Sequence, residues 1–405
     1  MVARSRSNGS TAGRIGIMAA DPGAPLPGAP DPWAPSDMPG RRAGPPYAMT
    51  EMIEAEPALA GRLVRKLTAD PGLVQVTELI LDAVRHNRPV TITGCGTSHH
   101  AAMAVASLVA DGLARAERPS YGVRAEQAFE LAGRTPSGGA VIAISHEGGT
   151  EATNAALRTA GGRTGPTALI TVGDRSPGAA LAATVLTTGE QDQSWCHTVG
   201  YLSPLIAGVG LHAALSRSEV PPDALERQVA AGADGVIAED LATGLAGTDR
   251  LLVVGSGVDY PAARELALKV EEGVRLPATA HELETLRHGH LAAATDRTGL
   301  VVILTDGDSR GADLHERAAA VLRAAAALGM PSVVLGSAGV ADVADWATAG
   351  RHLVDLDGQL ARPLAATLSA VLPLQLLTER LARARGTNPD TIGRDDPRQA
   401  AAASA

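Results

Sequence analysis

The chain contains the same strand, loop and helix pattern twice, and this duplication limits the fold more than any other feature. The apolar run 90–93 leads into a Gly-Cys-Gly loop at 94–96, and the apolar run 251–254 leads into a Gly-Ser-Gly loop at 255–257. A pair of alanines follows each loop at the same spacing, so the copies lie 161 residues apart, from 94 to 255. Repetition at a fixed offset indicates duplicated structural units. We therefore predict two related halves.

A second strand is repeated at nearly the same offset. The run 141–145 (Val-Ile-Ala-Ile-Ser) corresponds to 301–305 (Val-Val-Ile-Leu-Thr), and further apolar runs follow at 168–172 and 332–335. Alternation of such strands with helices is typical of a parallel sheet covered on both faces, so we predict an α/β fold with two such sheets. The expected organisation is a Pro- and Gly-rich disordered tail at 1–46, domains at 47–222 and 223–386, and a C-terminal tail at 387–405.

Composition argues against several classes of protein. The 405-residue chain has a net charge of −9, one Phe, four Tyr and three Trp, so neither charge nor aromatic stacking favours nucleic acid as a partner. Two cysteines, Cys95 and Cys196, provide neither a disulfide framework nor zinc spacing. The most apolar run, 201–215, is interrupted by Pro204 and Gly208, and the N-terminus shows no secretion signal. We expect a cytoplasmic protein without a membrane span.

The loop 145–150 (Ser-His-Glu-Gly-Gly-Thr) lies between a predicted strand and a predicted helix. Hydroxyls and N–H groups at a helix start bind anions such as a sugar phosphate, because that end of a helix carries partial positive charge. Glu147 conflicts with this interpretation, since its carboxylate lies where an anion would bind. We expect one of three arrangements: the substrate carries no phosphate here, Glu147 turns away, or its carboxylate itself accepts the loop N–H groups.

The densest cluster of reactive side chains is in the second half. A helical pattern after residue 257 carries Glu265, Lys269 and Glu272, and His288 follows further along. Glu265 and Lys269 are four residues apart, and we interpret them as a surface ion pair. A carboxylate and an imidazole near one sugar divide the work of isomerisation: the His acts on the ring oxygen and the Glu moves a proton between adjacent carbons. The alternative is a solvated Glu272 and a structural His288.

Other reactive residues are weaker candidates. His288 and His290 have metal-ligand character, but no nearby carboxylate or Cys completes a set, so we expect no metal. The glycine loops lack a well-placed acidic residue for a ribose, so we expect no dinucleotide and no other cofactor. In the segment 190–201, Trp195 and His197 are equally consistent with substrate contacts and with simple packing.

Together these motifs resemble the SIS (sugar isomerase) family, and most of all its tandem-domain members related to the isomerase half of glucosamine-6-phosphate synthase. The resemblance covers roughly residues 47 to 400. It rests on six stretches in the family's order: a first helix at 47–57, the Cys-Gly-Thr-Ser loop at 95–98, the S-x-S-G-x-T-like loop at 145–150, the E-G-A-L-K-L-K-E-like helix at 265–272, the L-K-H-G-P-L-A-like stretch at 286–292, and the tail at 386–398.

The resemblance implies site residues and an assembly. The residues implied to bind a sugar or sugar phosphate are Thr97, Ser98, Ser145, His146 and Thr150, with Glu147 in the same loop. Glu272 would be the proton-transfer base. His288 would open the sugar ring and would reach the site of a neighbouring subunit, so a homodimer is implied.

The sequence departs from the family pattern in two further ways. It shows no glutamine-hydrolysing domain with an N-terminal Cys, so we do not expect a complete glutamine-dependent synthase. The family's terminal lysine, which forms an imine with the keto sugar, would align near Ala402, and no lysine follows Lys269. Arg does not replace it because Arg stays protonated. We predict a sugar or aminosugar (phosphate) isomerase or deaminase that uses Glu and His; the alternative is a non-catalytic sugar-sensing module.

Overall fold

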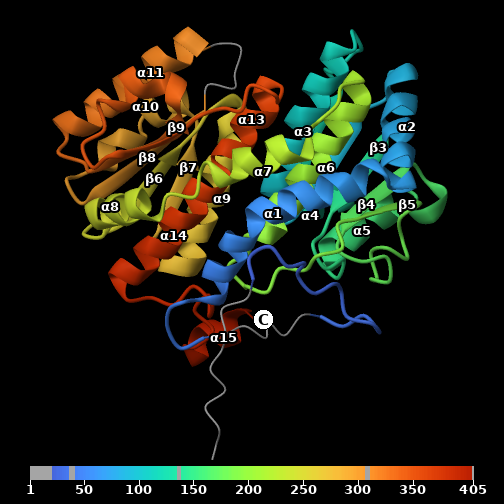
Figure 1. The fold of residues 1–405 in the computed structure, drawn as a ribbon, viewed down its shortest axis with the longest axis horizontal. Helices are drawn as coiled ribbons and strands as arrows, with labels where there is room; N and C mark the ends of the chain where they lie inside the picture. Colours follow the sequence, from blue (N-terminus) through green and yellow to red (C-terminus); the bar gives the residue numbers. More distant parts are fainter. Residues whose placement is uncertain (1–20, 36–41, 135–137, 306–310, 404–405) are drawn as a thin grey trace, which may run out of the picture.

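The computed structural model describes residues 21–35, 42–134, 138–305 and 311–403, and it contains two five-stranded parallel sheets (Figure 1). The first sheet has the order β2-β1-β3-β4-β5, with β1 (Val90–Gly94), β2 (Val123–Gln127), β3 (Ala140–Ile144), β4 (Thr167–Thr171) and β5 (Thr184–Thr187). The second has the order β10-β9-β8-β6-β7, with β6 (Arg250–Val254), β7 (Ala278–His281), β8 (Thr298–Leu304), β9 (Ser332–Ser337) and β10 (Arg351–Val354). The predicted α/β class is confirmed.

The two sheets share one topology. In the first sheet β1 lies between β2 and β3, and in the second β6 lies between β7 and β8, with the remaining strands following in sequence order. In such a sheet the strand order reverses between the first and third strands, and loops after these two strands form a crevice where ligands bind. The duplicated glycine loops follow β1 and β6, so each half has one such crevice.

Helices surround both sheets, and Figure 1 shows several of them between the two halves. The helices of the first half are α1 (Ala48–Thr68), α2 (Pro71–Arg85), α3 (Thr97–Arg115), α4 (Ala128–Ala132), α5 (Glu151–Thr159) and α6 (Val199–Ser216). Those that follow are α7 (Pro222–Ala230), α8 (Gly235–Leu245), α9 (Tyr260–Lys269), α10 (Leu283–Arg287), α11 (Gly311–Ala327), α12 (Ala341–Ala344), α13 (Arg362–Ser369), α14 (Val371–Arg385) and α15 (Pro397–Ala403). Helix α9 continues into a π-helical turn, η3 (Val270–Val274).

The largest of the three apolar clusters among the described residues runs through both halves. It joins residues of β1, β3 and β4 to α1, α3 and α6, and continues to α14 and β6. Helix α6 is apolar on all sides and long enough to cross a bilayer, but 89% of it is buried inside the protein, so it is a core helix. Its Gly208 lets α3 approach closely, because a Cβ there would lie only 2.9 Å from Val105 Cγ2.

Part of the predicted disordered tail is ordered against the first half. Arg62 Nη1 donates to the carbonyl of Gly23 (2.9 Å), the Leu26 N–H donates to Glu190 Oε2 (2.8 Å), and the Gln191 N–H donates to the carbonyl of Pro27 (2.8 Å). These partners are distant in sequence, so local periodicity could not predict the contacts between them. The prediction of disorder was therefore wrong for residues 21–35; residues 1–20 and 36–41 lie outside the described part of the chain.

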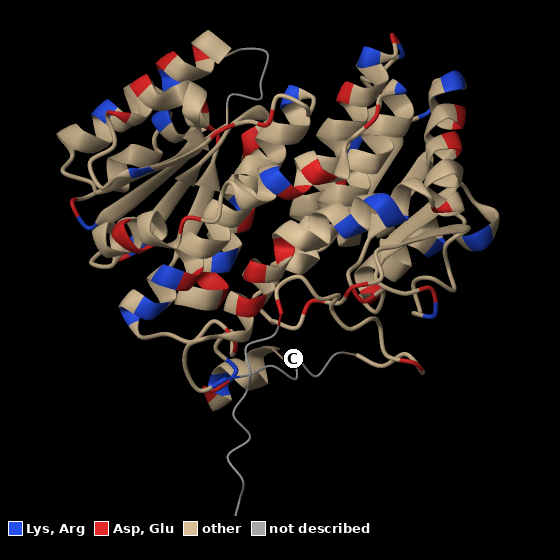
Figure 2. Cartoon of the chain, in the orientation of Figure 1, with Lys and Arg blue, Asp and Glu red and all other residues tan. Residues whose placement is uncertain are grey.

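Charged residues are spread over the outer helices. In the view of Figure 2, basic and acidic residues are interspersed over both halves of the described chain and do not form one basic face. The glycine loop at the end of β1 is instead surrounded by a few individually placed charges, which are described next.

Candidate functional site

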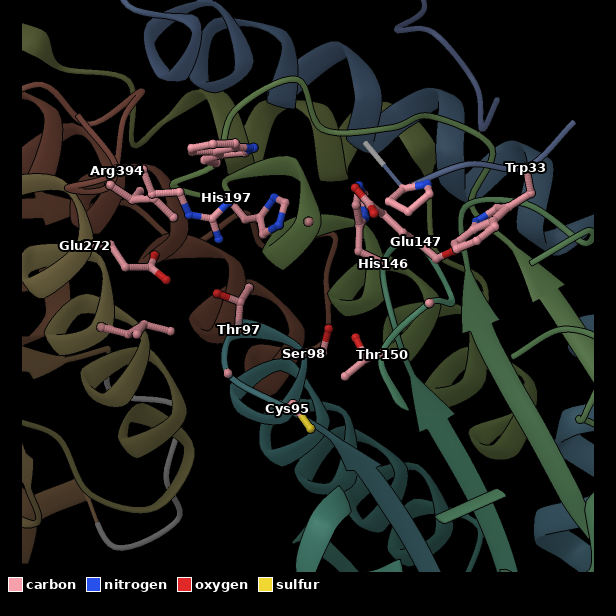
Figure 3. Close-up of a pocket in the computed structure, with 17 residues that line it drawn as sticks. Trp33, Cys95, Thr97, Ser98, His146, Glu147, Thr150, His197, Glu272 and Arg394 are labelled. Atoms are coloured by element: carbon pink, nitrogen blue, oxygen red, sulfur yellow. The ribbon is translucent and has the colours of Figure 1, made fainter. Parts of the chain in front are cut away.

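A cavity of about 740 Å³ opens beyond the carboxyl ends of β1 and β3, at the point where the strand order reverses (Figure 3). This volume is within the range of small-molecule sites. The residues that line it are Trp33, Pro35, Cys95, Gly96, Thr97, Ser98, His146, Glu147, Gly149, Thr150, Trp195, His197, Gly200, Leu268, Glu272, Ile392 and Arg394. Both halves of the chain therefore contribute to one cavity.

Two helices begin at the cavity without a side-chain cap. Gly96 precedes α3 with a φ of +53°, a conformation that glycine adopts without strain, and Thr150 precedes α5. Neither helix start has a side-chain hydrogen bond to its first-turn N–H groups. The partial positive charge of both helix ends, together with the Ser98 and Thr150 hydroxyls, is therefore available to a polar ligand.

Glu272 reaches the cavity from the second half. It lies in the π-helical turn η3, and Figure 3 shows its carboxylate across the cavity from Thr97 and Ser98. π-helical turns are rare and often occur at functional sites. Burial raises the pKa of Glu272 above its usual value, and the nearby charge of Lys269 opposes that rise. A raised carboxyl pKa brings the group closer to the range in which proton transfer is effective at neutral pH.

Beneath the cavity, Glu265 and Lys269 form a buried ion pair rather than the predicted surface pair. Lys269 Nζ lies 2.7 Å from Glu265 Oε1, and both side chains are fully buried. Thr97 Oγ1 donates to Oε1 (3.0 Å), and His100 Nδ1 lies 2.7 Å from Oε2. The surface interpretation was wrong because this face of α9 packs against α3 of the first half. The cluster joins the base-bearing helix to the first glycine loop.

A second buried carboxylate, Asp192, organises the segment that closes the cavity. Its Oδ2 accepts the N–H groups of Thr198 (2.7 Å) and Gly200 (2.9 Å), and lies 3.6 Å from His197 Nδ1. Burial alone would lower the pKa of His197, but Asp192 raises it. The Asp192 N–H donates to His146 Nε2 (2.9 Å), and burial with the charge of His197 lowers the pKa of His146 to about 4. The cavity thus contains a neutral His146 beside a His197 whose pKa is held above its usual value by Asp192.

Glu147 is among the residues that line the cavity. Its carbonyl accepts the Trp33 Nε1–H at 3.0 Å, and its Oε1 lies 3.5 Å from Gln191 Nε2. The Trp33 ring covers the loop at Gly149, where a Cβ would lie 2.9 Å from the ring. The choice among the three expected arrangements stays a prediction, and the carboxylate contacts the side chain of Gln191.

The structure brings most of the predicted residues together, but not all. Thr97, Ser98, His146, Glu147, Thr150 and Glu272 line the cavity. Ser145 is 3% exposed and lies behind the loop, where its N–H continues the ladder to β4. His288 follows α10, its side chain is 74% exposed, and its Nε2 lies 2.9 Å from Glu284 Oε1. It is not among the residues that line this chain's cavity.

Several cavity residues were not predicted. Trp33 and Pro35 belong to the N-terminal segment, and Ile392 and Arg394 to the C-terminal segment. Both segments lack hydrophobic periodicity, and an isolated Trp in a Pro-rich stretch is the only signal the first one offers.

Among the described residues, no group of three or more His, Cys, Asp or Glu side chains is placed to hold a metal ion.

Comparison with known proteins places this geometry in a family. Residues 244–335 match the model of the SIS domain family. This part of the chain is therefore similar to a SIS domain. A glutamine–fructose-6-phosphate aminotransferase (isomerizing) from Symbiobacterium thermophilum is 30% identical over 374 residues, which cover 86% of this chain and 58% of that protein. The chain thus spans little more than half the length of such relatives.

Solved structures show that the SIS fold extends over both halves. The C-terminal domain of glucosamine-fructose-6-phosphate aminotransferase from Francisella tularensis matches with a TM-score of 0.71 at 19% identity, over 86% of this chain and 99% of that one. Tagatose-6-phosphate ketose/aldose isomerase from Escherichia coli matches with a TM-score of 0.70 at 18% identity, over 87% of this chain and 96% of that one. The predicted resemblance to tandem SIS proteins is confirmed.

Proposed function

We propose that this protein is an aldose–ketose isomerase or an aminosugar deaminase that acts on a sugar or sugar phosphate in the cavity beyond β1 and β3. The observation that carries the proposal is the position of Glu272, a carboxylate of raised pKa that faces a glycine loop bearing hydroxyls and an uncapped helix start. The names of the matching aminotransferase and ketose/aldose isomerase support this reaction class. The fold resemblance alone would not, because one fold serves many functions.

The central step of the proposed reaction is the transfer of a proton between C2 and C1 by Glu272. The Glu272 carboxylate removes the proton from C2 of an open-chain aldose, and the carbonyl oxygen gains a proton, which leaves an enediol. Glu272 returns its proton to C1, and the C2 hydroxyl loses its own proton to form the ketose. With an amino group at C2, the same steps pass through an enolamine to an imine, and water then releases ammonia. General acid–base catalysis of this kind contributes roughly 10²- to 10⁴-fold to a rate.

We also propose that His288 opens the sugar ring from a second copy of the chain in a cytoplasmic homodimer. Its exposure on the surface of this chain leaves it available to a neighbouring subunit. The proposal does not include amine transfer from glutamine.

The test is deuterium uptake from heavy water at C1 and C2, followed by NMR, with a panel of plain, amino and phosphorylated sugars. We expect wild-type protein to label at least one sugar and Glu272→Gln to lose labelling while keeping its affinity for that sugar. The matched control is Glu271→Gln, because Glu271 is exposed in the same turn, does not line the cavity, and accepts the Ala278 N–H. Labelling that survives in Glu272→Gln would contradict the proposed base.

The second candidate is a sugar-sensing module that binds without turnover. The carboxylate of Glu147 in the loop favours it. A sugar that binds in calorimetry, yet takes up no deuterium with wild-type protein, would establish the sensor and exclude the enzyme.

A further inference from the structure

A single arginine stands on the wall of the cavity opposite Glu147. Arg394 lies in the C-terminal segment before α15, and its guanidinium carbon is 4.1 Å from the centre of the Trp195 ring. Of the described residues that line the cavity, Arg394 is the only Lys or Arg. Stacking on an aromatic face is a stable arrangement for a guanidinium and fixes the side chain in place.

The charge of Arg394 is free to meet a ligand. The two acidic residues that follow it are already paired: Asp395 with Arg275, and Asp396 with Arg398. Arg394 donates its backbone N–H to the carbonyl of Thr391 (2.9 Å), but its guanidinium has no carboxylate within 4 Å and no hydrogen bond among the described residues, so the Trp195 ring is its one side-chain contact of this kind there. A planar guanidinium with open donors is well suited to the two oxygens of a carboxylate or phosphate.

The positions of the charged side chains in the cavity determine where an anion can bind. Figure 3 shows Glu147 with Trp33 on one side, and Arg394 with Glu272 on the other. An oxyanion held by the loop 145–150 would meet the Glu147 carboxylate, whereas an oxyanion beside Arg394 would meet an opposite charge. Because Glu272 is the base proposed to act at C1 and C2, an anion at Arg394 must be attached near those two carbons rather than at the far end of the sugar.

We propose that Arg394, held by Trp195, forms an oxyanion subsite for a carboxylate or phosphate carried on the substituent of an amino group at C1 or C2 of the sugar, where the anion leaves the neighbouring carbonyl carbon free to react. This inference rests on the proposed function, because it takes the position of C1 and C2 from Glu272. The substrates would then be sugars that carry a negative charge close to C1 and C2, the carbons that react. It also explains how a loop that contains Glu147 can serve a charged sugar.

Calorimetric titration of matched ligand pairs tests the subsite. The pairs are glucosamine and N-carboxymethylglucosamine for the carboxylate, and glucose and glucose 1-phosphate for the phosphate; glucose 6-phosphate places the charge at the far end. We expect at least one of the two near-end anions to bind wild-type protein ten-fold or more tightly than its partner without the oxyanion. In Arg394→Met this preference should fall to within about two-fold, and whichever pair responds identifies the oxyanion.

The matched control is Arg398→Met, four residues further on, where the side chain is 93% exposed and pairs with Asp396 outside the cavity. It should keep the wild-type preference, and thermal melting should show that both variants are folded. The absence of a ten-fold preference in wild-type protein, its survival in Arg394→Met, or an Arg394-dependent preference for glucose 6-phosphate would each overturn the subsite.

The test separates the subsite from the enzymatic proposal. Loss of the anion preference in Arg394→Met without deuterium uptake in any sugar would support the subsite and remove the isomerase or deaminase. Deuterium uptake that depends on Glu272 but an anion preference that ignores Arg394 would leave the enzyme in place and remove the subsite.

Discussion

Each half has a glycine loop at the same position of its own sheet. The two loops differ in the side chain that they place at the start of the following helix. At the duplication offset of 161 residues, Ser98 corresponds to Asp259. Ser98 lines the cavity of the first half. Asp259 is 3% exposed, its Oδ2 accepts the Thr305 N–H at 3.2 Å, and its Oδ1 accepts the Thr305 hydroxyl.

This difference shows how a duplicated scaffold can keep one ligand site and fill the other. In the second half, an internal carboxylate already accepts donors at the strand end, where an anionic ligand would otherwise accept them. The nearby cavity is lined by Glu284, Asp313, Glu316 and Arg317 among its charged residues, so it is mainly acidic. In the first half, the corresponding position carries only a hydroxyl, and the helix start remains uncapped. We expect ligand binding to be confined to the first loop.

The largest effect should come from separating the ion pair that joins the halves. Lys269→Met leaves the buried Glu265 carboxylate without its cation, which costs about 3–5 kcal/mol in such pairs. Urea denaturation measures this loss. Arg297→Met, which breaks an exposed pair with Asp249, is the control and should change stability little. Equal losses in both variants would show that the buried pair has no special role.

The same pair gives the protein an acid-sensitive contribution to stability. Burial alone would raise the pKa of Glu265, but Lys269 and His100 lower it to about 2. A depressed folded-state pKa contributes stability above the unfolded value of about 4.5, and this contribution is lost as pH falls toward 2. Wild-type stability should therefore fall more steeply than that of Lys269→Met between these pH values in urea denaturation at stepped pH.

Placing the carboxylate of the second loop at the corresponding position of the first should weaken ligand binding. Ser98→Asp introduces the carboxylate of the second half into the first, where it competes for the donors of the helix start and repels an anionic ligand. We expect affinity for the best ligand to fall about 100-fold, or about 2.7 kcal/mol, measured by calorimetry. Ser98→Ala, which removes the hydroxyl without adding charge, should lose far less. Equal losses would assign the effect to the hydroxyl and refute the comparison.

Removing the charge of Asp259 should lower the stability of the protein without changing its affinity for the ligand. Asp259→Asn keeps the shape but removes the charge that accepts two donors from Thr305, and hydrogen bonds to charged groups contribute about 1.5–3 kcal/mol each. We expect a loss near the lower figure, because the amide oxygen still accepts. Thermal melting gives the stability, and ligand affinity should stay at the wild-type value. A matching fall in affinity would mean that the halves are not functionally separate.

The smallest expected effect concerns the N-terminal segment over the first loop. Trp33→Phe keeps an aromatic ring beside Gly149 but removes the donor to the Glu147 carbonyl, a bond worth about 1 kcal/mol. The apparent KM should rise a few-fold. Trp346→Phe is the control, since Trp346 is 48% exposed, packs under Arg323, and does not line the cavity. No change in KM would make the segment a passive cover rather than part of the site.

Prediction from sequence succeeded where the signal was local and repeated. The strands at 90–94 and 250–254, the glycine loops and the helices after them are visible as apolar runs and turn residues, and their order predicts the doubled parallel sheet. The edge strands β2 and β5 escaped notice, because they are short and only partly buried. In the site, Thr97, Ser98 and Glu272 could be predicted from motif positions.

The sequence by itself determined the two α/β halves, the loops that end β1 and β3, and the presence of Glu272 and the glycine loop in one chain. Only the tertiary structure decided that Glu265 and Lys269 are buried, that Arg394 and Trp33 line the cavity, and that His288 does not. The reason is physical. Local periodicity reports which face of an element is apolar, but not which distant surface covers it, and charges acquire their roles from those distant neighbours.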